Sequence, residues 1–600
     1  MSSHYIIQAV SPQAHLYEVT LKLDDLDVGH APVRLRLPDW IPGSYMIRDF
    51  SQHIVALQAL SDGYEIAVTR VDKSCWECPA GLSSLEVTYR VYAWDLSVRA
   101  AHLDLNHGFF NGTSVFLYAE GLEQNPVTVD IQLPSSPECK SWQVATSLSA
   151  ADIQANGFGL YKAANYDELI DHPVEMGTFT RCEFEACGVP HEIIFTGPIH
   201  TDLDRVANDL KRICEYQINF FGKPAPMDHY VFLVMVVGSG YGGLEHRAST
   251  ALMITRENLP IPGDDSTHDG YLSFLGLCSH EYFHTWNVKR IKPAAFTPFD
   301  LQAENYTRLL WFFEGMTSYY DDLFLRRCGL IDDETYFKLV AKNITRIQRT
   351  GGRLVQTVTD SSFDAWHKFY KQNENSPNAI VSYYGKGALV AMCLDAILRK
   401  RSSNKVTLDH LMRALWQRWL NTGEGLQEQE PESVATELLG QSLDDFFQPA
   451  LYGTSELDLE KALTSLGVQL NWRQRQSAAD TGGKIDKSGS FYWIGANVHA
   501  GEGDATLSHV FTDGAAERAG LAAGDKLVAI EELAVDSSNL VDILKRYASQ
   551  GKVRVHYFRL GVLSTTTMPI VIANNDTAYL TLQDKEKAML WLMDPANHPA

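Results

Sequence analysis

The segment "LCSHEYFHTWNVKR", residues 277–290, holds two histidines four positions apart, with a glutamate directly after the first. His280, Glu281 and His284 match the pattern H-E-x-x-H. On an α-helix, positions i and i+4 lie one turn apart on one face, so the two imidazoles can bind one metal ion. Although the chain has 20 histidines, chance would produce this pattern only roughly 0.04 times. The segment therefore predicts a metal site.

The residues around the motif predict a helix over 269–289. No proline interrupts this stretch before Pro293. The positions that follow a 3.6-residue period are mostly apolar, namely Leu272, Leu275, Ser279, Phe283 and Trp286. This places the H-E-x-x-H pattern in the middle of a helix, where its geometry suits a metal ion.

A third metal ligand is expected in "LLWFFEGMTSYYDDL", residues 309–323. A zinc site that leaves one position open for water takes three protein ligands. Glu314 follows a strongly apolar run, where a carboxylate is costly unless it is paired or bound to a metal. Asp321 or Asp322 could orient a ligand histidine from outside the ligand set.

The rest of the chain predicts a multidomain α+β fold. Residues 1–188 carry alternating strand patterns such as "HLYEVTLKLDDL" and indicate an antiparallel β domain. Residues 189–465 combine a buried strand, a glycine-rich segment and several helices, and this part would be the catalytic domain. Residues 466–578 read as a third domain of short strands, and residues 579–600 as a C-terminal tail.

Composition bears on partners and location. The net charge of -23 argues against a nucleic-acid partner, because a phosphate-binding surface needs a basic excess. We see neither a basic-then-apolar leader nor an apolar run of about 18 residues, so no membrane partner is expected. The nine cysteines, an odd number, fit a reducing compartment, and we expect a cytoplasmic protein.

At this point the motifs show a family resemblance. "SHEYFHTWNVKRIKP" (279–293) and "LWFFEGMTSYY" (310–320) resemble the glycyl aminopeptidase family, which comprises PDZ-containing zinc metallopeptidases. They resemble more distantly the thermolysin-like (gluzincin) aminopeptidases, in which W-x-x-E-G supplies the third zinc ligand. The resemblance implies a thermolysin-like catalytic domain with one Zn²⁺ per chain, bound by His280, His284 and Glu314. The connection between the two motifs is longer than in the distant group, which implies an inserted loop.

Two further motifs extend the resemblance to substrate binding. "GGLEH" (242–246) is similar to the exopeptidase motif G-x-M-E-N, which implies that Glu245 binds the α-ammonium of the substrate. Gly242 and Gly243 would present an edge-strand backbone to the peptide. "VSYYGKGALVAM" (381–392) resembles the Y-x-K-G element, whose tyrosine stabilises the oxyanion. Counting back from the glycine selects Tyr384, and the neighbouring Tyr383 remains an alternative.

The resemblance reaches both ends of the chain. "PDWIPGSY" (38–45) looks like an N-terminal signature of the family, and "AAERAGLAAGDKLVAI" (515–530) looks like a PDZ domain. A PDZ domain would bind a peptide or a protein C-terminus. The candidate carboxylate-binding loop, residues 493–496, lacks the usual first glycine, so a purely structural role stays open.

Together these motifs predict a zinc-dependent aminopeptidase. Glu281 would be the general base and Tyr384 the oxyanion donor, and the resemblance implies peptide substrates with N-terminal Gly or Ala. Two alternatives remain. One is a zinc hydrolase of other specificity, such as an endopeptidase or an epoxide hydrolase. The other is a PDZ-bearing peptide-binding or chaperone protein with an incidental metal site.

Overall fold

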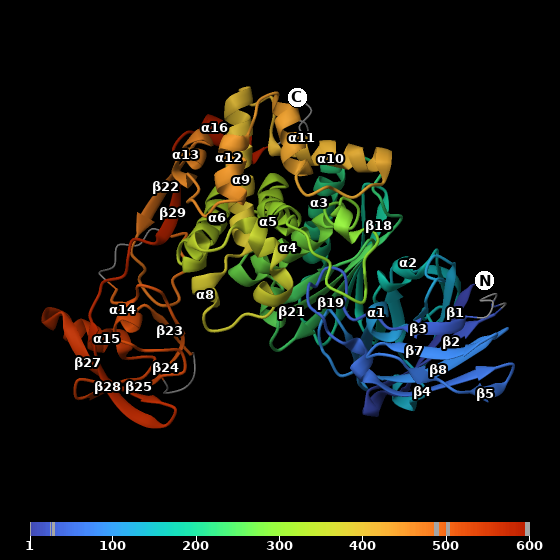
Figure 1. Ribbon diagram of the computed structural model, residues 1–600. Helices are drawn as coiled ribbons and strands as arrows, with labels where there is room; N and C mark the ends of the chain where they lie inside the picture. Colours follow the sequence, from blue (N-terminus) through green and yellow to red (C-terminus); the bar gives the residue numbers. More distant parts are fainter. Residues whose placement is uncertain (1, 25, 27–30, 485–490, 500–504, 594–600) are drawn as a thin grey trace. The chain divides into compact units, whose positions relative to one another are not determined.

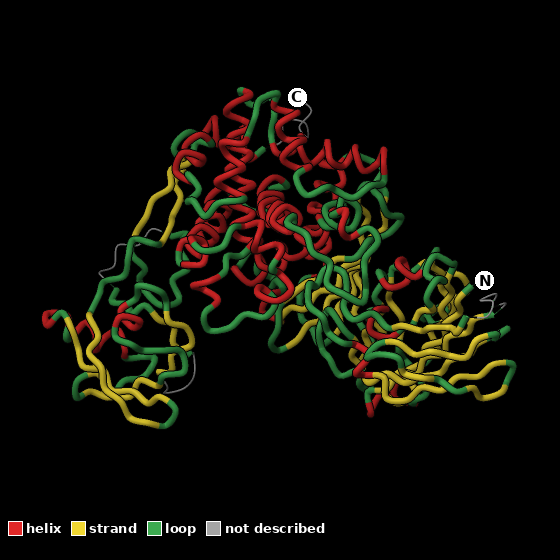
Figure 2. Tube along the Cα trace, viewed as in Figure 1, coloured by secondary structure: helices red, strands yellow, loops and turns green. Residues whose placement is uncertain are grey.

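The structure is a computed structural model that describes residues 2–24, 26, 31–484, 491–499 and 505–593 (Figure 1). Residues 485–490 and 500–504 of the predicted third domain, and 594–600 of the predicted tail, lie outside the described residues. The chain divides into two compact units. The first comprises residues 1–306 with 416–426, and the second 307–415 with 427–600. Strands dominate the start of the first unit and helices the start of the second (Figure 2).

The N-terminal part of the first unit is built of β-strands whose side chains alternate between buried and half-buried, as the sequence pattern predicts. Its largest sheet is, in spatial order, β14 (Ser149–Ile153), β15 (Gly159–Ala163), β12 (Val127–Gln132), β1 (Ser3–Ser11), β2 (Leu16–Leu23), β8 (Leu85–Tyr92), β4 (Ile54–Ser61) and β5 (Tyr64–Ile66). Two smaller sheets are β13 (Gln143–Thr146), β16 (Val174–Gly177), β10 (His107–Phe110) and β9 (Ala101–Leu103), and β11 (Tyr118–Ala119), β3 (Pro32–Arg36), β7 (Cys75–Ala80) and β6 (Thr69–Arg70).

One pairing corrects the prediction of a purely antiparallel domain. Strands β1 and β12 run parallel, with Ser3 opposite Val127. Parallel neighbours need a long connection between them, and here most strands of the domain intervene. The local alternation of side chains is the same for either direction, which is why the sequence could not show this.

A fourth, five-stranded sheet of the first unit carries the glycine-rich segment. Its order is β17 (Thr180–Ala186), β18 (Val189–Thr196), β19 (Tyr230–Val237), β21 (Ser249–Thr255) and β20 (Gly242–Glu245). The sheet begins at Thr180 rather than at the predicted boundary after residue 188, because β17 pairs with β18. The α-helices that lie wholly within the described residues of this unit are α1 (Gly112–Val115), α2 (Tyr166–Ile170), α3 (Leu203–Phe221) and α4 (Asp269–Phe283). Strand β20 lies at the sheet edge, next to β21 alone.

Helix α4 is shorter than the predicted span 269–289 and ends at Phe283. His284 is its C-cap and keeps helical dihedral angles, with its backbone N–H bonded to the carbonyl of His280. The chain then turns tightly, and Val288 adopts a φ of 147°. The motif therefore lies at the end of the helix instead of its middle, while the one-turn spacing of the two histidines is kept.

The second unit begins as a helical bundle of α5 (Leu310–Arg327), α6 (Asp333–Gln348), α7 (Val358–Phe363), α8 (Ser376–Ala379), α9 (Tyr383–Ser402), the start of α10 (Leu408–Thr422), α11 (Glu430–Leu439), α12 (Asp444–Leu451) and α13 (Leu459–Ser465). Helices α5 and α9 cross at two glycines. A Cβ on Gly315 would lie 2.6 Å from the Cα of Gly387, and a Cβ on Gly387 would lie 2.7 Å from the carbonyl oxygen of Trp311. Only glycine allows this backbone approach.

Among the described residues, one helical stretch, Ser376–Ser402, passes a length and hydropathy test for a membrane span. In the folded chain 83% of its most apolar window is buried, and a core helix of a soluble protein passes the same test. The stretch contains α9, which packs against α5.

The C-terminal part of the second unit has its own small core. This C-terminal part contains β23 (Ala496–Val498), β24 (Ala505–Val510), β25 (Lys526–Ile530), β26 (Leu533–Ala534), β27 (Lys552–Arg559), β28 (Val562–Pro569), α14 (Ala515–Arg518) and α15 (Leu540–Arg546). The flanking strands β22 (Val468–Arg473) and β29 (Thr577–Leu582) pair with each other.

The described part of the predicted C-terminal tail contains a strand and a helix. Residues 577–592 form β29 and helix α16 (Lys585–Leu592). The Trp591 side chain is fully buried, and its Nε1 donates a hydrogen bond to the Tyr319 hydroxyl on α5 at 2.8 Å. Burial of this large aromatic side chain holds the segment against the bundle.

Candidate active site

The two histidines of the motif are oriented as ligands of one ion would be. The ring centroids of His280 and His284 lie 4.7 Å apart. His284 is buried, and its Nδ1 donates to the backbone carbonyl of Asn287 at 2.8 Å. A carbonyl can only accept, so the proton is on Nδ1 and Nε2 is the ring nitrogen that carries the lone pair. The turn after α4 therefore fixes the tautomer of His284.

Strand β20 and helix α4 bring predicted residues together within the first unit. Glu245, Glu281 and His284 are all buried, and one ligand atom of each lies within 4.8 Å of the others. Only 4% of Glu245 and 5% of Glu281 is exposed. Gly243 makes this approach possible, because a Cβ there would lie 2.1 Å from Oε1 of Glu281. The glycine thus lets a carboxylate from α4 lie against the edge strand.

The "PDWIPGSY" segment is an ordered loop that packs on Glu245. A Cβ on Gly43 would lie 2.7 Å from Oε1 of Glu245, and Gly43 adopts a φ of +95°, which favours glycine. Trp40 anchors the loop, since its Nε1 donates to the carbonyl of Asp300 at 2.8 Å. Oε1 of Glu245 is buried and has no hydrogen-bond partner among the described residues. A buried carboxylate oxygen of this kind is costly and calls for a cationic ligand.

A buried ion-pair network explains part of the sequence after the motif. Asp171 receives Nζ of Lys289 at 2.7 Å, Nε of Arg247 at 2.9 Å and Nδ1 of His246 at 3.1 Å. Although burial opposes ionisation, Lys289 and then Arg247 hold the pKa of Asp171 well below its usual value. The network ties the residues directly after Glu245 to those directly after α4.

Arg290 stabilises the turn after α4 by donating hydrogen bonds to backbone carbonyls. Its guanidinium donates to the carbonyls of Thr285 at 2.7 Å and Arg247 at 3.1 Å. Burial lowers its pKa to about 10. Asn287, Lys289 and Arg290 thus serve positioning, which sequence reasoning did not explain.

The remaining predicted residues belong to the second unit. Glu314 lies in the first turns of α5 and is 2% exposed, beside the buried side chains of Trp311, Phe312 and Phe313. Tyr383 and Tyr384 open α9, whose N-cap Ser382 accepts from the N–H of Gly385. Tyr383 is fully buried, whereas Tyr384 is half-buried.

Sequence reasoning missed two features of the first unit. Arg99 donates to the carbonyl of Gly243 at 3.3 Å, and nothing local in the sequence indicates this contact. The group His102, Asp104 and His107 was also missed. Its signal in the sequence is the presence of two histidines and an aspartate within six residues, 102–107.

Metal-dependent peptidases combine a histidine pair one helical turn apart with a buried glutamate beside it. This site has both features, next to a glycine-lined edge strand. Residues 4–178 match the Peptidase M61 N-terminal domain and residues 273–390 match the M61 glycyl aminopeptidase domain. A crystal structure of an aminopeptidase N family protein from Idiomarina loihiensis is 40% identical, with a TM-score of 0.95, and the alignment covers 99% of this chain and 100% of that one. The chain belongs to the M61 glycyl aminopeptidase family, and family and relative together support a peptidase of the aminopeptidase type.

Other solved structures match the chain at lower identity. An M1 zinc metallopeptidase from Deinococcus radiodurans is 13% identical with a TM-score of 0.47, covering 76% of this chain and 94% of that one. A yeast LTA4 hydrolase in complex with bestatin is 14% identical with a TM-score of 0.47, covering 78% and 69%. At these TM-scores the two structures do not indicate the function of this chain. Among curated proteins, no relative matches the chain.

Proposed function

We propose that this chain is a zinc-dependent aminopeptidase that removes small residues from the N-termini of peptides. The single observation that carries the aminopeptidase assignment is the buried Oε1 of Glu245, which lacks a hydrogen-bond partner among the described residues and lies near Glu281. A free α-ammonium would satisfy this carboxylate. An N-blocked peptide would leave it buried and unsatisfied.

Three residues would hold the metal, namely His280, His284 and Glu314. Their donor set, two imidazoles and one carboxylate, suits zinc and leaves a position open. Support comes from the 4.7 Å ring separation of the histidines, from the tautomer fixed at His284 and from the burial of Glu314 in an apolar run. When bound, zinc supplies Lewis acidity and lowers the pKa of water to about 7.

The remaining chemistry belongs to side chains of this protein. Glu281 takes a proton from the attacking water and passes it to the leaving amine. The Tyr384 hydroxyl donates a hydrogen bond to the developing oxyanion. We favour Tyr384 over Tyr383 because it is half-buried and can reach a substrate, whereas Tyr383 is enclosed. We also propose Asp321 or Asp322 as the side chain that orients a ligand histidine.

Strand β20 would bind the peptide backbone at the sheet edge through Gly242 and Gly243. The proposed preference for N-terminal Gly or Ala rests on the family resemblance, and the description of the family specifies glycyl residues. This preference is supported by the loop at Gly43, whose close approach to Glu245 and Leu244 restricts the space beside the carboxylate.

We also propose that residues 466–578 form a PDZ-like domain. Its antiparallel strands and two short helices support this assignment. A peptide or a protein C-terminus would be its ligand. We keep a cytoplasmic location as a proposal, which rests on the odd number of cysteines in the sequence.

The test of the mechanism is Glu281→Gln with zinc content measured in parallel. We expect retained zinc and loss of hydrolysis of Gly- and Ala-linked chromogenic amides, by about 10²-fold or more. Undiminished turnover would exclude Glu281 as the general base. For Glu245, equal activity on free and N-acetylated peptides would exclude the exopeptidase role.

The same experiments separate the alternatives. A zinc hydrolase of other specificity would contain metal but ignore aminoacyl amides, and would cleave internal peptide bonds or epoxides. A binding or chaperone protein would hydrolyse none of these substrates. No structural observation favours either alternative over the aminopeptidase.

A further inference from the structure

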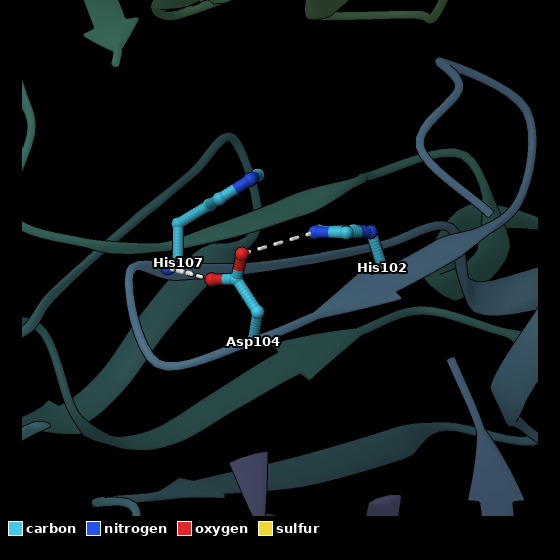
Figure 3. A group of neighbouring side chains, drawn as sticks. All are labelled: His102, Asp104 and His107. Atoms are coloured by element: carbon cyan, nitrogen blue, oxygen red, sulfur yellow. Dashed lines mark hydrogen bonds and ion pairs between the residues drawn. The ribbon is translucent and has the colours of Figure 1, made fainter. Parts of the chain in front are cut away.

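A second group of metal-ligand side chains lies in the N-terminal β part, on the hairpin formed by β9 and β10 (Figure 3). His102, Asp104 and His107 each offer one ligand atom, and these atoms lie within 4.8 Å of one another. None of the three belongs to the site proposed above. The two imidazole centroids are 4.9 Å apart, close to the 4.7 Å of the His280–His284 pair.

Asp104 is held in place by the turn of the hairpin. Its Oδ1 accepts the backbone N–H groups of Asn106 at 2.6 Å and His107 at 3.0 Å. Its Oδ2 lies 3.7 Å from Nε2 of His102, whose ring is directed at the carboxylate in Figure 3. Oδ1 thus accepts two backbone N–H groups of the turn, whereas Oδ2 accepts one hydrogen bond, from Nδ2 of Asn106 at 3.2 Å, and keeps a further lone pair for a ligand.

His107 has the partner that a metal-binding histidine usually has. Its Nδ1 lies 3.0 Å from Oε1 of Glu175, a buried carboxylate on the neighbouring strand β16. A hydrogen bond from Nδ1 to a carboxylate orients the ring and leaves the Nε2 lone pair for an ion. Glu175 thus takes the place of the outer carboxylate in a carboxylate–histidine–metal arrangement.

His102 is buried with unmet hydrogen-bonding capacity. The residue is 4% exposed, its Nδ1 has no partner among the described residues, and Nε2 makes only the 3.7 Å contact with Asp104. The unpartnered Nδ1 and the long contact of Nε2 leave the His102 ring able to serve as a metal ligand. The indole of Trp94 stacks on it with centroids 4.9 Å apart and limits its movement.

We propose that His102, Asp104 and His107 bind a divalent ion of the zinc class at a site separate from the active site. Two imidazoles and one carboxylate form a donor set that zinc accepts, and water would complete the coordination. Asp104, whose side chain is 24% exposed, provides the access for that water. The three donor atoms need to draw together by small side-chain rotations when the ion binds.

The ion would stabilise the hairpin next to the active site. Asn111, just after β10, donates from Nδ2 to the carbonyls of Val98 at 3.0 Å and Ala100 at 3.3 Å. These residues flank Arg99, which donates to Gly243 in the edge strand. The role is therefore structural, and its loss is expected to leave the chemistry in place.

The test counts ions in the full-length chain. Wild-type protein and variants are stripped with a chelator, dialysed against excess Zn²⁺ and then buffer, and measured by inductively coupled plasma mass spectrometry. Asp104→Asn keeps the turn acceptor but removes the anionic ligand, and we expect one bound ion fewer per chain with amidase activity retained. Asp152→Asn, on the exposed strand β14, is the matched control and should bind as wild type does.

A second background separates the two sites. In His280→Ala/His284→Ala protein, we expect one ion per chain to remain, and adding Asp104→Asn should remove it. His107→Ala provides an independent route to the same loss, with folding verified by circular dichroism. If no ion remains in the His280→Ala/His284→Ala protein, or if Asp104→Asn and His107→Ala both bind as many ions as wild type, the proposal is wrong. These outcomes do not depend on whether the active site is a peptidase.

Discussion

Gly243→Ala tests the geometry of the active site at a single carbon atom. The added Cβ would lie 2.1 Å from Oε1, 2.5 Å from Cδ and 2.8 Å from Cγ of Glu281. Relief requires a separation above 3.0 Å, so the carboxylate must retreat by about 1 Å. Misplacement of a catalytic group by about 1 Å can cost about 10²-fold in rate, or about 2.7 kcal/mol in activation free energy. Gly243 is not among the glycines with a positive φ, so its backbone conformation does not itself exclude alanine.

The assay is kcat/KM for Ala-linked chromogenic amides, with zinc content and unfolding temperature measured on the same preparations. Gly242→Ala is the matched comparison, because its Cβ would meet only the Arg99 guanidinium at 3.6 Å, an ordinary contact. We expect the Gly243→Ala loss to exceed the Gly242→Ala loss at least tenfold, mostly in kcat. Shortening the base with Glu281→Asp should cost less in the Gly243→Ala background than in wild type. Equal activity of the two alanine variants, with zinc retained, would refute the reasoning.

Three further predictions concern stability. Gly315→Ala should destabilise the second unit by about 2 kcal/mol, since overpacking against the Gly387 backbone (about 3 kcal/mol) outweighs the helix propensity gained (about 1 kcal/mol); urea unfolding checks this. Asp171→Ala should cost about 3 kcal/mol because it leaves buried cations unpaired, and an unchanged unfolding temperature would contradict it. Burial lowers the pKa of His172 from 6.5 to about 3, so the unfolded state binds the extra proton and stability falls as pH drops from about 6.5 towards 3. His172→Gln should make the acid loss of unfolding temperature shallower, by about 1.4 kcal/mol per pH unit in free energy.

The sequence predicted those parts of the site that are set by local spacing. His280, Glu281 and His284 lie within one helical turn, and a 3.6-residue period determines their arrangement wherever the helix ends. The prediction that the helix continues to residue 289 was wrong. Its end is determined by the contacts of Lys289 and Arg290 with distant residues, which no local pattern records.

Long-range contacts account for most of what was missed. Gly43 lies about two hundred residues from Glu245 in the sequence. Its role depends on the contact between its loop and strand β20 of the five-stranded sheet. The parallel pairing of β1 with β12 has the same origin, because alternation predicts strands but not their neighbours. A resemblance in "PDWIPGSY" indicated that the loop mattered, but only the packing explains why.

The glycines in the motifs have one physical role in common. Gly243 allows Glu281 to lie against the edge strand, and Gly315 and Gly387 are each other's contact across α5 and α9. The final glycines of W-x-x-E-G and Y-x-K-G, Gly315 and Gly387, thus form a single helix crossing. This crossing sets how Glu314 and Tyr384 are held within the second unit. Substitutions at Gly315 and Gly387 therefore act on one contact, and their costs in unfolding free energy should not be additive. A double-alanine variant whose loss of unfolding free energy equals the sum of the single losses would show that the two glycines act independently.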